Sequence, residues 1–335
     1  MKAPVISFVL PVYNVGPYLR RCFDSILQSV GAHADRCEVV VADDGSTDDS
    51  AAIIDEYAAA YPALFRPFHK QNEGVSRTRN FGLDHATGQY IWFVDPDDKV
   101  EPAAVSEILD ALERLDRPQI VQMAYRRFND RETFELQNTA TKEEVLDGAA
   151  YMDAYTPNPY LWSKLMSRAF LNAHNLRFTP GLNTQEDWLL SYYAYCRADR
   201  IACTNIHAYD YFLGNPTSIL RNPSAASRRR SIADSLAVGK EFHAFAATQA
   251  DRPYYAALRS QESIFTAGFL YSLFTMKLPA GEVKQVLKKS REIGIYPAPY
   301  GRNKRGNKFL RFANRSWIFL PVCWLHSLRG KLPKA

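Results

Sequence analysis

The first hundred residues alternate between continuous apolar runs and segments with helical spacing, and this alternation restricts the fold more than any other feature of the chain. Continuous apolar runs are typical of strands that are buried on both faces of a parallel sheet. A strand-then-helix order predicts an open, mostly parallel α/β sheet, flanked by helices and joined by right-handed crossovers. The expected strands are 5–10, 37–43, 64–68 and 90–94, and the expected helices are 18–27, 50–61 and 75–86.

The pattern becomes less regular beyond residue 117. We expect a strand at 118–128 with a hairpin partner at 132–136, helices at 161–174 and 185–196, and a pair of strands within 200–213. From about residue 225 the spacing indicates helices only. The two prolines of the segment 215–224 place a boundary near 220. The predicted organisation is therefore an α/β domain over 1–220, a helical extension over 221–300 and a tail over 301–335.

The cysteines and the N-terminal segment limit the class of protein. The chain has five cysteines, an odd number, and they form no CxxC pair. This argues against a zinc knuckle or a disulfide framework and favours a reducing cytoplasm. The apolar stretch after Met1 has neither a basic region nor a small-residue cleavage site, so it is predicted to be a strand rather than a signal peptide.

Acidic residues directly follow two of the predicted strands. Asp43 and Asp44 end the second, and Asp95, Asp97 and Asp98 follow the fourth. Ligands of open α/β sheets bind outside the carboxyl ends of the strands. The second cluster has three interpretations: a solvated loop that caps the next helix, a hard-cation site with oxygen ligands, or a pair of catalytic carboxylates. The local sequence leaves all three open.

Four segments, which occur in order along the chain, together resemble the GT-A glycosyltransferases of family 2. They are SFVLPVYN (7–14), VVVADDGSTDDS (39–50), NEGVSRTRNFGLDHATGQYIWFVDPDD (72–98) and EDW (186–188). The resemblance is dense over 5–100, thinner over 118–220 and absent beyond. Bacterial members build capsules, lipopolysaccharide and exopolysaccharides. The resemblance therefore implies a GT-A, Rossmann-like fold and an inverting hexosyl- or N-acetylhexosaminyl-transferase that uses a nucleotide sugar, with UDP as the expected nucleotide.

The resemblance also implies a set of donor-binding residues. Pro11 and Tyr13 match the segment that contacts the nucleotide base, and Asp44 matches the residue that hydrogen-bonds the uracil edge. Asp43 would support this turn, and Gly45 would let it bend tightly. Further matches lie over the nucleotide and after the fourth strand: Asn72, Gly74, Arg77, Arg79, Asn80, Asp95 and Pro96. Among these, Arg79 is expected to reach the donor.

The metal and the general base follow from two further motifs. Asp95 and Asp97 match the family's DxD motif, whose first carboxylate tends toward the ribose and whose later one tends toward Mn²⁺ or Mg²⁺; Asp98 is the alternative metal ligand. Such a metal stabilises the charge that develops on a nucleoside diphosphate leaving group. Asp187 matches the general base that takes the proton of the acceptor hydroxyl, and Glu186 has a supporting role.

Three residues are candidates for the acceptor side, and one loop departs from the family pattern. Trp162 and Lys164 match a segment near the acceptor, and Trp188 offers a flat face for a sugar ring but suits a core position equally well. The loop YFLGNPTSIL (211–220) has Phe, Leu and Gly where family members often carry Arg or His. This loop thus lacks the basic residue that would contact the diphosphate, and Arg221 is the candidate substitute.

The charge of the chain is concentrated at its C-terminus. Residues 301–335 contain nine Lys and Arg and no Asp or Glu, whereas residues 1–300 contain 32 basic and 36 acidic side chains, a balance of −4. Basic residues combined with Trp and Phe favour an anionic membrane surface, with Trp317, Phe319 and Trp324 as inserting residues. A nucleic-acid site and a structural C-terminal helix are the alternatives, and nothing else in the chain resembles a nucleic-acid-binding module.

The leading hypothesis is a metal-dependent, inverting glycosyltransferase that acts on a glycan or lipid-linked acceptor, peripheral on the inner face of the cell membrane. A nucleotidyltransferase would be expected to show a glycine-rich triphosphate loop near the N-terminus, and LPVYNVGPYLRR (10–21) is not one. A catalytically inactive sugar-binding or scaffold protein remains the second alternative because of the altered 211–220 loop. The acidic residues that the family uses for catalysis argue against it.

Overall fold

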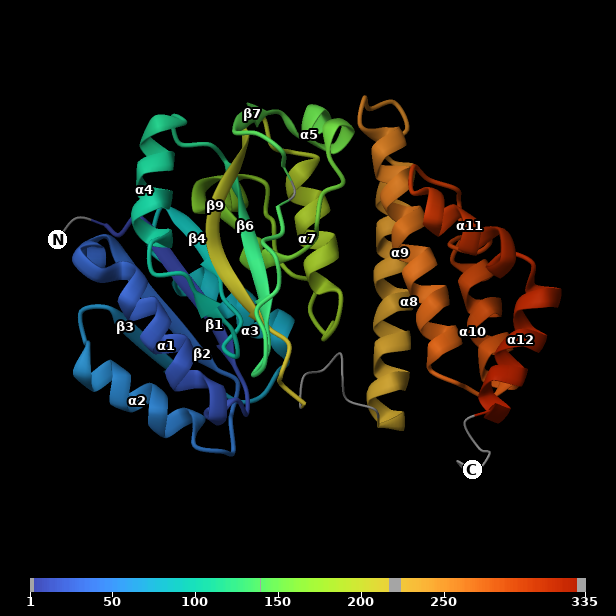
Figure 1. Ribbon diagram of the computed structural model, residues 1–335, viewed down its shortest axis with the longest axis horizontal. Coiled ribbons are helices and arrows are strands. Elements are labelled where there is room, and N and C mark those ends of the chain that lie inside the picture. The colour runs from blue at the N-terminus through green and yellow to red at the C-terminus, as the bar shows by residue number, and fades with distance from the viewer. Residues whose placement is uncertain (1–2, 139, 217–223, 330–335) are drawn as a thin grey trace. The chain divides into compact units, whose positions relative to one another are not determined.

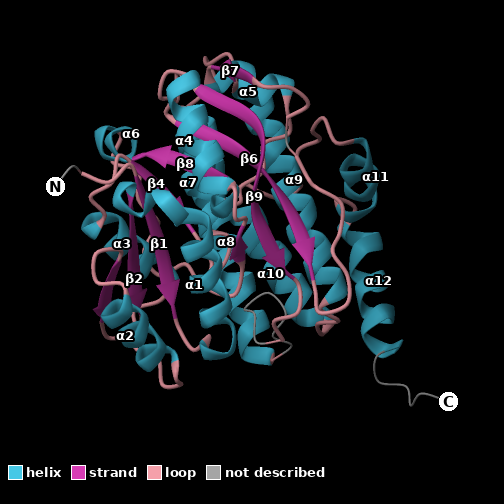
Figure 2. Ribbon diagram, turned by 60° about the vertical axis from the view of Figure 1, so that its left-hand side comes forward, coloured by secondary structure: helices cyan, strands magenta, loops and turns pink. Residues whose placement is uncertain are grey.

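The computed structural model describes residues 3–138, 140–216 and 224–329. The chain divides into two compact units, Met1–Ser218 and Ile219–Ala335. The first unit contains a single mixed sheet with helices, and the second contains helices (Figures 1 and 2).

The N-terminal half of the sheet is parallel, as the alternating pattern predicts. Its strands lie in the order β3-β2-β1-β4, and every residue of β1 and β2 is buried. Helices α1, α2 and α4 cover one face of the sheet and α3 covers the other (Figure 1). The strands are β1 (Ile6–Val12), β2 (Cys37–Asp43), β3 (Phe65–His69) and β4 (Tyr90–Phe93), and the helices are α1 (Gly16–Val30), α2 (Ser50–Ala60), α3 (Val75–His85) and α4 (Ala104–Arg114), with a 3-10 helix, η1 (Gly31–Arg36), after α1.

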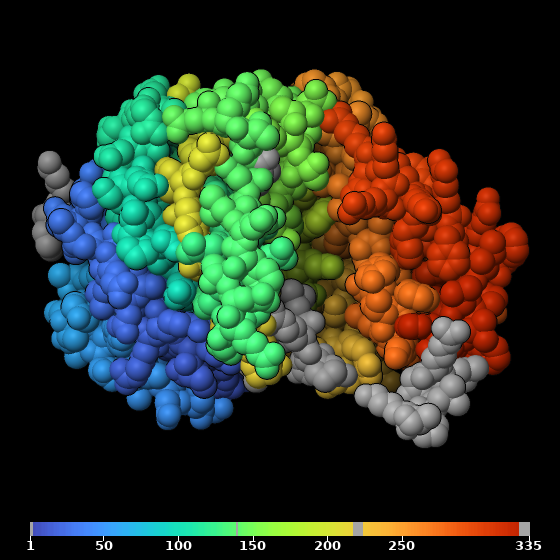
Figure 3. Space-filling model, in the orientation of Figure 1, coloured from blue at the N-terminus to red at the C-terminus, as the bar shows by residue number. Residues whose placement is uncertain are grey.

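Beyond β4 the sheet becomes mixed and continues in the order β8-β6-β9-β5, with β7 also paired to β9. Strand β8 is antiparallel to β4 and β6, whereas β6 and β9 are parallel. Figure 3 shows a strip of β9 (yellow) at the surface, between α4 and the segment after β6. The strands are β5 (Lys99–Val100), β6 (Ile120–Phe128), β7 (Glu144–Leu146), β8 (Lys164–Ser167) and β9 (Ile201–Phe212). The helices are α5 (Gly148–Ala154), η2 (Leu161–Ser163), α6 (Arg168–Ala173) and α7 (Glu186–Tyr195).

Two local predictions are wrong in this half. The segment 161–174 is not one helix but a 3-10 turn, the strand β8 and the short helix α6, because β8 fills the position between β4 and β6. The segment 200–213 is not a strand pair but one twelve-residue strand, whose pairing with β6 shifts register near Ala124. The expected hairpin partner at 132–136 forms no strand and meets β6 through one isolated bridge, from Thr133 to Phe128.

The second unit consists of helices around their own apolar core. They are α8 (Ala225–Ala247), α9 (Tyr255–Thr275), α10 (Ala280–Glu292), α11 (Lys304–Ala313) and α12 (Ser316–Arg329). Phe269, Leu287, Ile295 and Phe319 are among the buried core residues. None of the helices in the described residues combines the length and hydrophobicity that are needed to cross a membrane. The predicted class, an α/β sheet flanked by helices with a helical C-terminal extension, is confirmed.

Candidate active site

The turn after β2 holds Asp43 and Asp44 through backbone donors. Asp44 accepts from the Glu73 and Gly74 amides at 2.9 Å and from Lys70 Nζ at 2.6 Å. Asp43 accepts from the Ser46 amide at 2.9 Å, and its other oxygen lies 2.9 Å from His69 Nδ1. Both carboxylates are buried, so the turn after β2 and the loop before α3 form one rigid unit.

Two glycines are required where these segments meet. Gly45 has φ of 74°, and a Cβ there would lie 3.1 Å from the Asn72 amide. Gly74 has φ of 89°, and its Cβ would lie 2.9 Å from Asn183 Oδ1. A side chain at either position would force the neighbouring atoms to move. In addition, the positive φ of both positions is unfavourable for any residue other than glycine.

Arg79 connects the end of β4 with the start of α7. Its Nη2 donates to Asp95 Oδ1 at 2.9 Å, and its Nη1 donates to Glu186 Oε1. The Arg79 and Glu186 side chains are nearly buried, whereas the Asp95 side chain is 30% exposed. Residues 79, 95 and 186, which are far apart in the sequence, therefore form one ion-pair network at the carboxyl edge of the sheet. Such planar, forked donation is a property of Arg that Lys lacks.

The three aspartates after β4 have different environments. Asp98 is fully buried, and its carboxylate accepts from Tyr209 Oη at 2.8 Å and from the Phe212 amide at 2.6 Å. Asp97 is partly exposed and accepts from Asn215 Nδ2 at 2.8 Å. Burial and the neighbouring charge of Asp95 raise the pKa of Asp97. Both oxygens of Asp98 bind protein donors in the interior, so we do not keep its assignment as a metal ligand, and Asp97 remains the candidate.

Asp187 lies in the first turn of α7, and α7 begins after Gln185, which adopts a left-handed backbone conformation. Burial and the charge of Glu186 raise the pKa of Asp187, while Arg79 and Lys164 oppose this effect. Burial lowers the pKa of Lys164, whose Nζ donates to the Tyr160 carbonyl and lies 3.3 Å from Ser191 Oγ. A carboxyl group whose pKa is raised by a buried environment is suited to accept a proton near neutral pH.

The prediction that Trp162 lies on the acceptor side is wrong in one respect, because its ring is not accessible to an acceptor. Only 7% of Trp162 is exposed, and its ring stacks on Tyr160 at 4.9 Å and on Tyr209 at 4.8 Å, so both faces are covered. Tyr160, which ends this stack, is 40% exposed. Burial and the charge of Asp187 both raise the pKa of the Tyr160 phenol. The Tyr160 carbonyl accepts from Lys164 Nζ, which lies 3.3 Å from Ser191 Oγ, so Tyr160 lies beside α7, the helix of the candidate base.

The other predicted residues divide into exposed and structural ones. Tyr13, Asn72 and Arg77 are exposed near the Asp44 turn, whereas Pro11 is buried within β1 and Pro96 is buried after β4. Asn80 exchanges two hydrogen bonds of 2.9 Å with the backbone of Phe178, so its amide is already used. Trp188 is partly exposed on α7 and packs against Tyr192. Lys164 is fully buried and so cannot contact an acceptor directly. Arg221, Ser218 and Ile219 lie outside the described residues.

Sequence reasoning missed four residues of this site: Lys70, Tyr160, Tyr209 and Asn215. Lys70 and Asn215 bind the carboxylates of Asp44 and Asp97, and Tyr209 binds Asp98. Asn215 belongs to the loop that lacks the expected basic residue, so this loop meets the DxD carboxylates through an amide. A position-by-position match has no signal for such partners, because they come from strands and loops distant in sequence.

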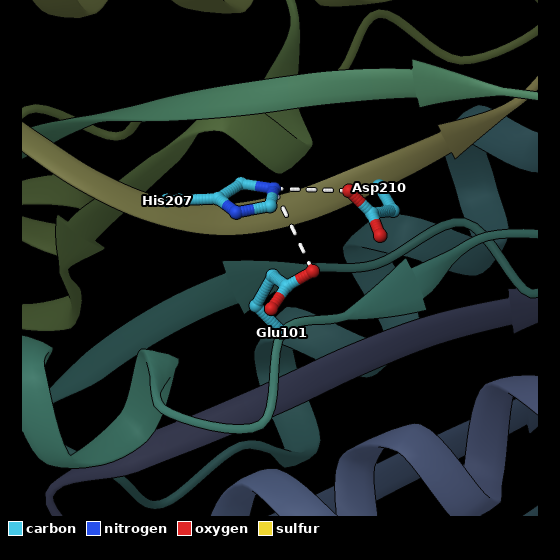
Figure 4. A group of neighbouring side chains, drawn as sticks. All are labelled: Glu101, His207 and Asp210. Carbon is cyan, nitrogen blue, oxygen red and sulfur yellow. Dashed lines mark hydrogen bonds and ion pairs between the residues drawn. The ribbon is translucent and has the colours of Figure 1, made fainter. Parts of the chain in front are cut away.

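Glu101, His207 and Asp210 form a second cluster of residue types that can bind metals (Figure 4). One ligand atom of each lies within 4.8 Å of the others, with His207 Nε2 2.9 Å from Asp210 Oδ1. Arg126 donates to Glu101 Oε1 at 2.8 Å and to Asp210 Oδ1 at 3.2 Å. Against the effect of burial, hydrogen bonds from His207 and Arg126 lower the pKa of Asp210 to about 2. Since a guanidinium already supplies the positive charge, this cluster joins β9 to the segment after β5 rather than forming a metal centre.

Comparison with known proteins identifies the family. Residues 7–175, about half of the chain, match the family described as glycosyl transferase family 2. The chain is 29% identical over 225 residues to EpsJ of Bacillus subtilis (strain 168), which is named an uncharacterized glycosyltransferase; the match covers 66% of this chain and 64% of EpsJ. The chain therefore belongs to glycosyl transferase family 2, and it spans less than two thirds of the length of this relative.

Solved structures agree in fold. Residues 1–349 of S. aureus TarS in complex with UDP-GlcNAc superpose with a TM-score of 0.70 at 18% identity, covering 98% of this chain and 93% of that one. The mannosyltransferase PcManGT of Pyrobaculum calidifontis, in complex with GDP-Man and Mn²⁺, gives 0.53 at 15% identity, covering 99% and 89%. At these identities the likeness concerns the fold alone.

Proposed function

We propose that the chain transfers a sugar from a nucleotide donor, with inversion at the anomeric carbon, to a hydroxyl group of a glycan or lipid-linked acceptor. One observation carries this proposal: Arg79 binds Asp95 of the DxD motif and Glu186, the neighbour of Asp187, at the same time. Asp95 and the first turn of α7, which carries the candidate base, are thus joined through one arginine at the edge where open α/β sheets bind ligands.

The donor side is proposed to hold a nucleotide diphosphate and a divalent cation. Tyr13 and Asn72 lie exposed beside the rigid Asp44 turn, where the base would bind. Asp95 and Asp97 fit Mn²⁺ or Mg²⁺ because both are oxygen donors. Burial and then the nearby charge of Asp95 raise the pKa of Asp97, so a cation would relieve the unfavourable charge there. When bound, the cation would neutralise charge on the diphosphate leaving group. Proteins of the same fold bind UDP-GlcNAc, or GDP-Man with Mn²⁺, which supports a nucleotide sugar as donor.

Asp187 is proposed to be the general base. Its carboxylate would take the proton of the acceptor hydroxyl while that oxygen forms a bond to the anomeric carbon. The bond from this carbon to the diphosphate oxygen breaks, and the nucleoside diphosphate leaves with the electron pair. Glu186 is already paired with Arg79 and so cannot serve as well, since its carboxylate is held by the guanidinium. Its role is to position the start of α7.

Tyr160 is proposed to form the wall for the acceptor in place of Trp162. Its ring is held from one side by Trp162, it is 40% exposed, and its carbonyl is joined through Lys164 to Ser191 of α7, the helix that carries Asp187. Flat aromatic faces bury the apolar face of a sugar ring well, and the phenol adds a polar contact. Family membership supports a cell-surface polysaccharide as the product, and a lipid-linked acceptor would hold the reaction at the inner face of the cell membrane.

Calorimetry of UDP binding with and without Mn²⁺ tests the donor site. We expect Mn²⁺ to increase the affinity of the unaltered protein about ten-fold, equivalent to about 1.4 kcal/mol. Asp97→Ala should abolish most of this gain, because it removes a cation ligand. Asp110→Ala, which removes an exposed carboxylate from α4, is the matched control and should keep the gain.

Two results would contradict the proposal. Equal affinity for UDP with and without Mn²⁺ in the unaltered protein would remove the cation from the site. If no member of a panel of nucleotide sugars releases its nucleoside diphosphate in the presence of the protein, although UDP binds, the protein is an inactive sugar-binding or scaffold protein rather than a transferase.

A further inference from the structure

Helix α12 presents an apolar face to the solvent in addition to the one it buries. Phe319 and Cys323 are buried in the core of the helical unit, so the expectation that Phe319 inserts into a membrane is wrong. Trp317, Trp324 and Leu325 are 75%, 49% and 53% exposed. Positions 317 and 324 are seven residues apart and therefore share one side of the helix.

This exposed face differs from an ordinary helix surface, which is polar. Residues 316–328 contain no Lys, Arg, Asp or Glu, and Pro321, between the two exposed tryptophans, is exposed as well. A contiguous exposed apolar patch of this kind marks an interaction surface in a stable protein. The buried face explains why the helix folds onto the unit, but it does not explain the tryptophans.

Helix α11 presents a face that is purely cationic. Lys304, Lys308 and Arg311 follow the spacing i, i+4, i+7 and are exposed, whereas Leu310 and Ala313 on the other side of the helix are buried. Within the described residues, these three cations form no ion pair with an acidic side chain. The exposed face of α11 thus attracts anions, and the whole segment 301–335 contains no acidic residue that would repel them.

The two helices are joined into one surface element. Helix α12 begins three residues after α11 ends, and Phe319 packs against Phe312 at 5.6 Å and Phe309 at 6.4 Å between ring centres. Beside Trp324 an open, apolar groove of about 380 Å³ is lined by Ala280, Gly281 and Lys284 of α10 and by Leu320, Pro321 and Trp324 of α12. An apolar recess with a lysine at its side suits an acyl chain below an anionic headgroup.

We propose that α11 and α12 dock on the surface of an anionic lipid bilayer. The Trp317–Trp324 face would enter the interface, where tryptophan is favoured, and the α11 cations would contact the headgroups. Charge complementarity selects this partner, since each engaged cation strengthens binding about five-fold at an anionic surface. A second copy of the chain would bring like charge, and a nucleic acid would leave the uncharged Trp–Pro–Trp–Leu face without a matching surface.

Co-sedimentation of the full chain with vesicles tests the inference. The vesicles are phosphatidylcholine alone, or phosphatidylcholine mixed with phosphatidylglycerol, each at low and high NaCl. The double variant Trp317→Ala/Trp324→Ala should weaken binding to anionic vesicles about ten-fold at both salt concentrations. The triple variant Lys304→Gln/Lys308→Gln/Arg311→Gln should weaken it mainly at low salt, where charge is least screened.

Matched controls separate the surface from general effects. Tyr300→Ala removes a comparably exposed aromatic residue outside α12, and Lys240→Gln/Lys288→Gln/Lys289→Gln removes the same charge from α8 and α10. Both controls should bind vesicles as the unaltered chain does. Circular dichroism and unfolding midpoints should be unchanged in every variant, because all the substituted side chains are exposed.

Three outcomes would overturn the inference. The first is equal binding of the double tryptophan variant and the unaltered chain to anionic vesicles. The second is binding of a short RNA or DNA duplex, weakened by the triple variant, while vesicles do not bind. The third is a change of oligomeric state in the double variant without lipid, which would assign this face to a second copy of the chain. None of these readouts depends on sugar transfer, so the inference can fail while the proposed function stands.

Discussion

The edge of the sheet and helix α12 depart from ordinary burial in opposite directions. At the sheet edge Asp98, Glu186 and Lys164 are buried although they are charged types, whereas on α12 Trp317 and Trp324 are exposed although they are large apolar ones. Both arrangements run against the usual preference of these residues. The difference between them lies in how each is compensated.

Buried charges at the sheet edge are compensated inside the protein. Asp98 accepts from Tyr209 and the Phe212 amide, and Glu186 is paired with Arg79. Such a buried arrangement must be satisfied internally before any ligand arrives, because an unpaired buried charge costs several kcal/mol. Within the described residues the tryptophans of α12 have no comparable compensation, and we assign their explanation to the lipid surface proposed above. The buried charges at the sheet edge therefore need no ligand to be stable, whereas the exposed face of α12 suits the lipid partner proposed above.

The largest effect is expected at the base. Asp187→Asn removes proton acceptance but keeps the size of the side chain, so transfer should fall by roughly two to four orders of magnitude. UDP affinity should stay nearly unchanged, since Asp187 is not assigned to the donor. The measurement is steady-state transfer together with calorimetric UDP binding.

Glu186→Gln is the matched variant for this prediction. It should weaken transfer less, and through the position of α7, because Arg79 loses the charge of one partner. Near-normal transfer by Asp187→Asn, combined with a severe loss in Glu186→Gln, would show that the two roles are reversed.

A series of three aromatic residues measures the contrast between the two regions directly. Trp162→Ala should lower the free energy of unfolding by about 3–5 kcal/mol because the ring is buried in a stack. Tyr160→Ala should cost less, about 1–2 kcal/mol for a half-exposed ring, and Trp317→Ala should stay within about 0.5 kcal/mol. Urea unfolding of the three variants gives these values.

The same series tests the acceptor wall. Tyr160→Ala should also raise KM for the acceptor while leaving KM for the donor unchanged, and Tyr160→Phe should restore much of the loss. If Trp317→Ala destabilised the protein as much as Trp162→Ala, the exposed ring would be part of the fold, and the contrast between the regions would not hold.

The smallest effect is a displacement of the pH profile. The proposed base, Asp187, can accept a proton only as a carboxylate, and burial together with Glu186 raises its pKa. The rate should therefore fall with decreasing pH at values above the ordinary carboxyl range near about 4. The check is kcat/KM for the acceptor as a function of pH at saturating donor.

Stability should respond with the opposite sign in the same window. Between the unfolded and the raised folded pKa, the folded state binds a proton that the unfolded state has lost, so raising the pH through this window lowers the free energy of unfolding. Asp187→Asn should remove this contribution. A rate profile that falls only near about pH 4 would mean that the base has an ordinary pKa.

The sequence predicted the parallel half of the sheet well because its signal is local. Strands β1 to β4 have short apolar runs, and the helices between them have periodic spacing, so each element carries its own pattern. The segments 161–174 and 200–213 failed because their structure is decided by pairing across the sheet. A short apolar run such as that of β8 is equally compatible with a turn of helix when the strands that pair with it are unknown.

The candidate site was predicted as a set of positions but not as a set of contacts. The strand pattern placed Asp95 and Asp97 directly after the fourth strand, and the helical pattern placed Asp187 at a helix start, which is where β4 and α7 have them. Asp98 is buried against Tyr209, and Trp162 is covered by Tyr160. No spacing of residues in the sequence indicates either of these contacts. Exposure of Phe319 was predicted wrongly for the same reason, since α12 has apolar residues on both sides.

In the proposed reaction, Arg79 couples the specificity for the donor to the specificity for the acceptor, because it binds a residue on each side. One guanidinium spans Asp95, after β4, and Glu186, at the start of α7, so the two segments cannot shift independently. A substitution that moves the end of β4 to admit a different sugar would also displace Asp187 from the attacking hydroxyl. New donor specificity is therefore more accessible through Tyr13, which is 50% exposed and lies outside the Arg79 network, and sequences that diverge in nucleotide preference should diverge there first.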